Sequence, residues 1–226
     1  MEKINQQIVS CERCLRLKDY RKKVAAEKVR RFAGEEYWGR PVPGFGDDGA
    51  RLFIVGLAPA AHGANRTGRM FTGDRSGDWL FRALHRAGFA SQADSIHRSD
   101  GLTLQDCYIG AVARCAPPAN KLQKSEIENC NDYLLGEFNA LENLRVILSL
   151  GQLAFRKMLV LLEANGFGPF RPRPAFGHGA EVQISNHLRL ISSYHPSQQN
   201  TFTGKLTEEM FDQVFSRVWS CLENSQ

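Results

Sequence analysis

Long apolar runs are missing from this 226-residue chain, and their absence argues against a protein that spans a membrane. No segment approaches the roughly eighteen consecutive apolar residues that a membrane-spanning helix requires. The segment MEKINQQIVSCERC at the N-terminus also lacks the apolar stretch of a secretory signal. No internal repeat is visible, so nothing indicates a repeat architecture. We therefore expect a cytoplasmic protein without a membrane segment, folded as a single domain over residues 1–226.

Acidic side chains are in deficit, with 24 Asp and Glu against 29 Lys and Arg, a formal net charge of +5. A basic balance is compatible with a polyanionic partner such as nucleic acid. Arg66, Arg69 and Arg75 share a glycine-rich loop, which makes them the more informative basic residues. The basic stretch RLKDYRKK at 16–23 is interpreted as a solvated helix face.

Short apolar segments alternate with helical patterns along the chain. Buried strands are predicted at four places, which are residues 51–59, 106–115, 145–151 and 188–196. Helices are predicted at four others, which are residues 78–87, 125–141, 152–164 and 207–222. In the second of these helices, Ser125 and Glu128 have the spacing of a capping box. The alternation predicts an α/β fold with three layers, α/β/α, around a mainly parallel sheet.

Ligands of such sheets bind beyond the carboxyl ends of the strands. Three loops should meet there: GLAPAAHG at 56–63, RCAPPANK at 114–121 and SYHPSQQN at 193–200. Chemistry is therefore expected in these loops. The segment at 165–179 is rich in Gly and Pro and is interpreted as a long surface connection.

Six cysteines are present, and four of them have positions that suit a metal site. Cys11 and Cys14 form a CxxC pair, whose spacing allows two thiolates to face one metal. Cys115 at a strand end and Cys130 near a helix start could complete the set. A structural zinc and a [4Fe–4S] cluster fit four thiolates equally well, and simple burial of the latter two is a third interpretation. Cys107 and Cys221 are interpreted as small buried hydrophobes.

At residues 63–70 the glycine-rich loop is similar to the GxxxxGK[ST] phosphate loop, but it differs at the two positions that contact the phosphates and the magnesium ion. Arg69 replaces the lysine and Met70 replaces the hydroxyl residue, and no helix is expected before residue 74. A bare backbone instead permits close approach to a flat ligand, with the Phe71 ring to stack on it and the Asp74 carboxylate nearby. Core packing of Phe71 and helix capping by Asp74 remain alternatives.

Several of these segments together resemble the uracil-DNA glycosylase superfamily, and within it family 5, the b-type enzymes. The resemblance is carried by the four cysteines above and by three stretches of sequence, which are YWGRPVPGFGD at 37–47, GLAPAAHGANRTGRMFTGD at 56–74 and YHPSQQNTFTG at 194–204. It extends over nearly the whole chain. It implies a four-stranded parallel sheet, a [4Fe–4S] cluster on Cys11, Cys14, Cys115 and Cys130, and hydrolysis of the N-glycosidic bond of damaged bases in DNA.

The resemblance also implies roles for individual residues. Asp74 is expected to polarise water or stabilise the positively charged sugar, while Asn120 orients water or contacts the base. His195 should donate to a carbonyl oxygen of the departing base. Contacts to the flipped nucleotide are expected from nine further residues, which are Gly56, Leu57, Ala58, His62, Phe71, Ser197, Gln198, Gln199 and Asn200. Of these, Phe71 stacks on the base, backbone amides at 56–62 donate to it, and residues 197–200 hold phosphates.

Uracil is the expected main substrate, with hypoxanthine and other deaminated or modified bases also possible. The expected partner is duplex DNA, bound by a monomer associated with the nucleoid. Alternatives are a non-catalytic iron–sulfur DNA-binding module, a structural zinc protein and a family 4 enzyme. Against the last, residues 58–61 read APAA, where the family 4 pattern has an acidic residue.

Overall fold

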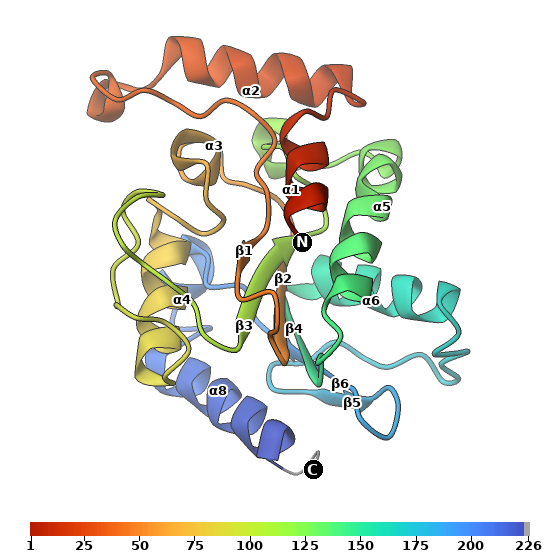
Figure 1. The fold of residues 1–226 in the computed structure, drawn as a ribbon. Helices are drawn as coiled ribbons and strands as arrows, with labels where there is room; N and C mark the ends of the chain where they lie inside the picture. Colours follow the sequence, from red (N-terminus) through yellow and green to blue (C-terminus); the bar gives the residue numbers. More distant parts are fainter. Residues whose placement is uncertain (224–226) are drawn as a thin grey trace.

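A six-stranded sheet forms the centre of the computed structural model, which describes residues 1–223 (Figure 1). The strand order is β1-β3-β2-β4-β6-β5. The four inner strands are parallel and confirm the predicted strands; they are β2 (Leu52–Gly56), β3 (Cys107–Ala111), β4 (Val146–Leu150) and β6 (Arg189–Ser193). Two short antiparallel strands, which the sequence did not predict, extend the edges; they are β1 (Phe45–Gly46) and β5 (Glu181–Gln183).

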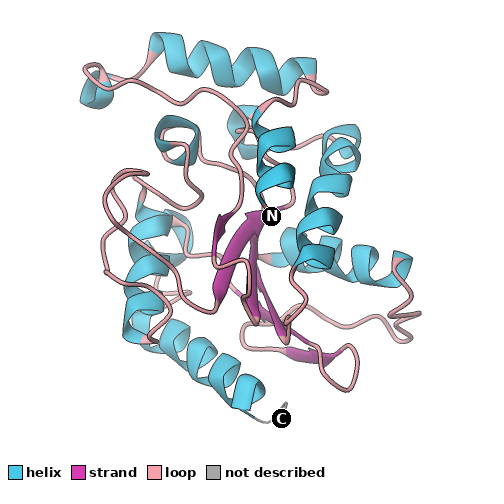
Figure 2. Cartoon of the chain, in the orientation of Figure 1, coloured by secondary structure: helices cyan, strands magenta, loops and turns pink. Residues whose placement is uncertain are grey.

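Helices cover both faces of this sheet, as expected for a three-layer fold (Figures 1 and 2). One face packs against α4 (Arg75–Arg86) and α8 (Glu208–Glu223). The other packs against α5 (Lys124–Ala140) and α6 (Gln152–Ala164). The inner strands are buried on both faces because each face supports its own apolar core.

Helix α5 begins earlier than predicted, because a different residue caps it. Its N-cap is Gln123, and Glu126 completes the capping box by accepting from the Gln123 backbone N–H at 2.7 Å. The predicted pair Ser125 and Glu128 is therefore wrong, since Ser125 already lies within the first turn. Glu126 also accepts two hydrogen bonds of 2.7 Å from Arg16, which favours the earlier start.

The first thirty-two residues form a separate layer over the carboxyl ends of the strands (Figure 1). It consists of α1 (Glu2–Val9), α2 (Leu15–Glu27) and the single turn η1 (Arg30–Phe32). Ion pairs fasten it to α5, between Arg16 and Glu126 and between Arg13 and Asp132. Within residues 1–223, no helix combines the length and the apolar character needed to cross a membrane.

Candidate active site

The side chains of Phe71 and His195 meet where strands β2 and β6 end. Their ring centroids are 5.9 Å apart, with the planes inclined by 30°. Phe71 has a φ of 53°, a backbone conformation that few non-glycine residues adopt. Its ring is held against Gly56, where an added Cβ would lie only 2.8 Å from Cζ of Phe71. Gly56 is thus required for the position of the ring.

His195 is half-buried and uncharged. Burial lowers the pKa of its imidazole to about 4, so the neutral form predominates at neutral pH. Among residues 1–223, the ring nitrogens have no hydrogen-bond partner. A neutral imidazole without a partner can donate one N–H to a ligand, as a base carbonyl would require.

The loop after β6 fixes His195 from its backbone side. Its carbonyl oxygen accepts from Asn200 Nδ2 at 2.8 Å and from the Ser197 backbone N–H at 2.8 Å. Ser197 also caps the short helix α7 (Gln198–Phe202). Ser197 and Asn200, predicted to hold phosphates, thus use these groups to shape the His195 loop, and their contact with DNA stays a prediction.

Asp74 caps helix α4 and lies against the glycine loop. Its Oδ1 accepts from the Gly77 backbone N–H at 3.0 Å, so the capping interpretation is confirmed. The other oxygen, Oδ2, would lie 2.0 Å from a Cβ added to Gly63. Burial raises the pKa of Asp74, although hydrogen bonds from the amides of Gly77 and Ser76 oppose the shift. A capping carboxylate with a raised pKa is suited to take up a proton.

Four backbone amides of the first loop remain available for a ligand. Those of Ala58, Ala60, Ala61 and His62 donate to no other residue in the described part of the chain. The His62 ring is engaged, since its Nδ1 lies 3.1 Å from the Tyr37 hydroxyl. These amides support the expectation that this loop presents donors to a base.

A single helical turn, α3 (Ala64–Thr67), lies inside the loop, where we expected no helix before residue 74. It forms because Gly68 ends it in the left-handed conformation, with a φ of 79°. Leu57 packs against the apolar core that includes α6, and its carbonyl oxygen accepts from the Ala113 backbone N–H at 2.9 Å. Its contact with a ligand stays a prediction.

The arginines of the glycine loop do not face a partner as we expected. Arg66 and Arg69 are only 6 % and 4 % exposed. Arg66 pairs with Glu35 and also donates to the His62 carbonyl, whereas Arg69 binds both oxygens of Asp100 at 2.9 and 2.7 Å. Both side chains therefore brace the loop from behind, so they do not supply the exposed positive charge that a polyanionic partner would contact.

The third loop residue, Arg75, lies nearer the surface. Its guanidinium carbon is 4.2 Å from the centroid of the Phe202 ring, which is itself 68 % exposed. Gln198 and Gln199 are exposed on the same short helix, α7. This arrangement leaves the two glutamines free to approach a nucleic acid, as predicted for them.

Asn120 lies in the loop that follows β3. It ends the turn η2 (Pro118–Asn120) with a φ of 56°, directly after Ala119, which has a φ of 51°. Its side chain is exposed and makes no hydrogen bond within residues 1–223. Two successive non-glycine residues in the left-handed conformation are energetically unfavourable. The catalytic role of Asn120 stays a prediction.

The four predicted cysteines line one pocket, beneath the N-terminal layer. Cys11 and Cys14 come from the turn between α1 and α2, Cys115 from the loop after β3, and Cys130 from α5. Cys107 and Cys221 are buried elsewhere in the apolar core, as interpreted. The fold has therefore brought together the cysteines that were selected from sequence.

The donors around this pocket suit a sulfur-rich group. Asn129 Nδ2 donates to Cys14 Sγ at 3.3 Å, and the Arg114 backbone N–H donates to Cys130. Among residues 1–223, no three His, Cys, Asp or Glu side chains are arranged to hold one metal ion. A four-iron cluster instead binds one cysteine at each iron and spreads the thiolates apart. The four cysteines that line the pocket are of the ligand type that such a cluster requires.

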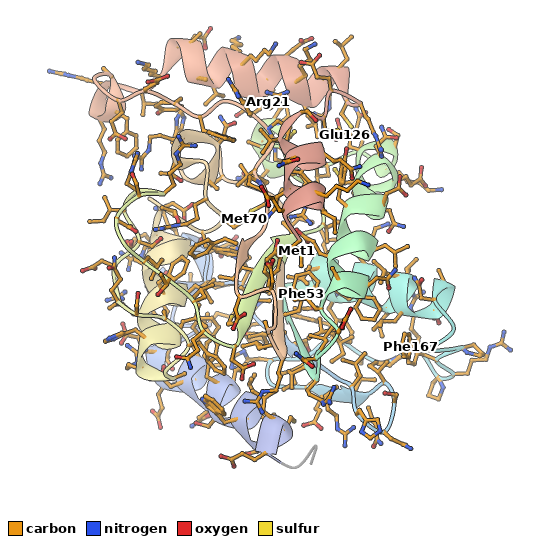
Figure 3. All side chains as sticks on the ribbon, viewed as in Figure 1. Met1, Arg21, Phe53, Met70, Glu126 and Phe167 are labelled. Atoms are coloured by element: carbon orange, nitrogen blue, oxygen red, sulfur yellow. The ribbon has the colours of Figure 1, made fainter. Side chains whose placement is uncertain are left out.

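Sequence reasoning missed two arginines that line the same pocket, Arg21 and Arg114. Arg21 lies on the side of α2 that faces the rest of the chain (Figure 3). Because Leu17, Arg21 and Val24 are the buried residues of α2, their helical spacing was the signal that could have identified Arg21. The interpretation of 16–23 as a solvated face is wrong for Arg21.

We expect His195 to make stability depend on pH. The unfolded chain takes up a proton near pH 6.5, whereas the folded chain resists protonation down to about pH 4. Stability is therefore lost as the pH falls from 6.5 towards 4. When the pH is lowered from 7.5 to 5, the free energy of unfolding of the parent protein, measured in urea, should fall by about 2 kcal/mol more than that of a His195→Gln variant. Equal losses in both proteins would contradict the buried, neutral imidazole.

Comparison with known proteins shows the class to which this fold and site belong. The family model described as the uracil DNA glycosylase superfamily matches residues 43–219. The chain therefore belongs to the uracil-DNA glycosylase superfamily. The matched region contains both loops of the candidate site, along with Cys115 and Cys130, but begins after Cys11 and Cys14.

Individual relatives define the group more closely. A protein of Mycobacterium leprae named Type-5 uracil-DNA glycosylase is 49 % identical over 94 % of this chain and 91 % of its own length. One of Thermus thermophilus with the same name is 44 % identical over 92 % of each chain. A Type-4 uracil-DNA glycosylase of Archaeoglobus fulgidus is 30 % identical over 69 % of this chain. The chain belongs to the type-5 group, and the choice of family 5 over family 4 is confirmed.

Proposed function

We propose that this chain is a monofunctional DNA glycosylase that removes uracil from DNA and so initiates base excision repair. Hypoxanthine and other deaminated bases are further proposed substrates. The observation that carries the proposal is His195, a neutral imidazole without a partner, held beside Phe71 where the central strands end. The names of the type-5 relatives agree with this activity.

Hydrolysis begins when the target nucleotide leaves the base stack and enters the site. Phe71 stacks on the base, and the amides of the first loop donate to its edge. As the C1′–N1 bond breaks, its electron pair stays on the base, and His195 donates a hydrogen bond to the carbonyl oxygen that gains negative charge. The Asp74 carboxylate stabilises the positively charged sugar and accepts a proton as the oxygen of water bonds to C1′.

Weak discrimination among bases follows from this arrangement. The donors on the base edge are mainly backbone amides, and stacking on Phe71 does not depend on the identity of the base. Neither group rejects a ring that differs in one exocyclic substituent. Hypoxanthine therefore joins uracil as a proposed substrate.

A [4Fe–4S] cluster is proposed on Cys11, Cys14, Cys115 and Cys130. When bound, the cluster supplies four iron–sulfur bonds that tie the N-terminal layer to α5 and the loop after β3, and it can also exchange an electron. The four side chains would be thiolates in that state. The donors from Asn129 and from the Arg114 backbone stabilise negative charge on two of the sulfur atoms.

Strand scission at a single site tests the activity. An end-labelled duplex with one uracil opposite guanine is incubated with the protein and then heated in alkali. A labelled product of the expected length that requires alkali supports base removal without lyase action, and a duplex with hypoxanthine extends the test to the second base. A matched duplex with thymine opposite adenine is the control.

The alternative of a non-catalytic module is decided by the same experiment. If the protein contains iron and binds the uracil duplex but releases no base from uracil or hypoxanthine, the proposed activity is wrong. The site would then serve only to bind DNA.

A further inference from the structure

Two buried guanidinium groups in the wall of the cysteine pocket have unused hydrogen-bond donors. Arg21 and Arg114 are only 3 % and 1 % exposed. Within residues 1–223, Nε of Arg21 and both Nε and Nη1 of Arg114 have no acceptor. A buried donor without an acceptor is unfavourable, and here three such atoms belong to two residues that line one pocket. One buried acceptor, Oε1 of Glu137, is also without a partner and belongs to the residue that pairs with Arg114, so the missing acceptor is clearest for Arg21.

Each guanidinium is anchored from behind by the protein. Arg21 Nη1 donates to the Gly39 carbonyl oxygen at 2.5 Å. Arg114 Nη2 forms an ion pair with Glu137 of α5, whose side chain is fully buried. With one end fixed and no route to solvent, neither group can turn away from the pocket.

The sulfur atoms of the four cysteines are acceptors that share this pocket with both arginines. A neutral thiol is only a weak acceptor. Four thiolates bound to an iron–sulfur core are anionic, and their sulfur atoms accept N–H hydrogen bonds that tune the cluster. Arginine suits this position because it stays charged even when buried.

We propose that Arg21 and Arg114 donate hydrogen bonds to the sulfur atoms of a bound iron–sulfur cluster and supply its buried positive counter-charge. This inference rests on the proposed [4Fe–4S] cluster and goes beyond it by naming residues that hold the cluster without being its ligands. Two consequences follow: the arginines favour the reduced, more negative cluster, and they slow its loss.

The first variant removes the charge of Arg21 and its donors while keeping an unbranched, flexible side chain in the same place. Arg21→Met should lower the reduction potential of the cluster, measured by protein-film voltammetry. A tenfold shift in the reduction equilibrium is about 59 mV for one electron. Loss of the visible absorption in excess chelator should be roughly tenfold faster than in the parent, because a hydrogen bond to a charged group has been removed.

Lys23→Met is the matched control. Lys23 lies on the same helix, is 66 % exposed and, within residues 1–223, pairs only with Glu27. Its replacement therefore removes the same charge at a solvent-exposed position. Arg21→Lys separates charge from geometry, because it keeps the charge but removes Nε. Its potential should lie between those of the parent and Arg21→Met.

A measurement on the unmutated protein covers the case in which Arg21→Met does not fold. The chain is grown with arginine labelled with ¹⁵N in the guanidinium group only, and the reduced cluster is studied by pulsed electron paramagnetic resonance. Magnetic coupling of the cluster to a guanidinium ¹⁵N is expected. Absence of such coupling overturns the inference.

The remaining outcomes separate this inference from the proposed cofactor. A parent protein that contains no iron after anaerobic reconstitution overturns both. A parent that contains the cluster, with Arg21→Met equal to Lys23→Met in potential and rate of cluster loss, overturns the role of the arginines and leaves the cluster in place.

Discussion

Replacement of Asp74 by Asn is expected to slow the removal of uracil about 100- to 10,000-fold in single-turnover assays. Asparagine has nearly the same size, and its Oδ1 can still accept from the Gly77 amide, so helix α4 keeps its cap. Only the charge and the ability to accept a proton are lost. The rate is measured with enzyme in excess over a duplex that contains one uracil.

Asp74→Ala is the companion variant, because it also removes the cap. Its free energy of unfolding should be about 1 kcal/mol lower than that of the parent, whereas Asp74→Asn should unfold like the parent. Thermal unfolding measures this difference. An Asp74→Asn protein with the activity of the parent would show that Asp74 only caps the helix. DNA affinity, measured by fluorescence anisotropy, should be similar in all three proteins.

Replacement of His195 by Ala is expected to lower the same rate about 100- to 1,000-fold, the effect of removing one donor to a developing negative charge. The change removes no buried charge, since the imidazole is neutral at neutral pH. His195→Gln retains an amide N–H and should recover part of the rate. The rates of all three proteins are compared on the duplex used for Asp74.

The pH profile distinguishes a neutral donor from an ordinary histidine. With a pKa of about 4, His195 does not titrate between pH 6 and 8. The parent and His195→Gln should therefore have rate–pH profiles of the same shape near pH 6.5. An inflection that disappears in the variant would mean that the charged imidazole takes part.

The parallel strands could be predicted because each is buried on both faces and is therefore a continuous apolar run. β1 and β5 could not, since two or three residues are too few to establish a period. The start of α5 was misplaced because Gln123 and Ser125 compete for the cap, and contact of Glu126 with Arg16 favours Gln123.

In the candidate site, features that depend on short motifs could be predicted, whereas features that depend on partners remote in sequence could not. The roles assigned to the loops follow from short motifs, and the meeting of Phe71 with His195 agrees with them. The arginines were misjudged because their acidic partners are remote in sequence: Glu35 precedes Arg66 by 31 residues, and Asp100 follows Arg69 by 31. Nothing in the loop itself indicates that these charges are already neutralised.

The N-terminal layer has a consequence for how the chain is made. Cys11 and Cys14 leave the ribosome about a hundred residues before Cys115, so at 5 to 20 residues per second they wait about 5 to 20 seconds for their companions. Throughout that interval Arg16 of α2 also lacks Glu126, its partner in α5, because that residue is synthesised later still. The part of the protein that is synthesised first is thus among the last to reach its final place, and nascent chains that stall before residue 115 carry it exposed.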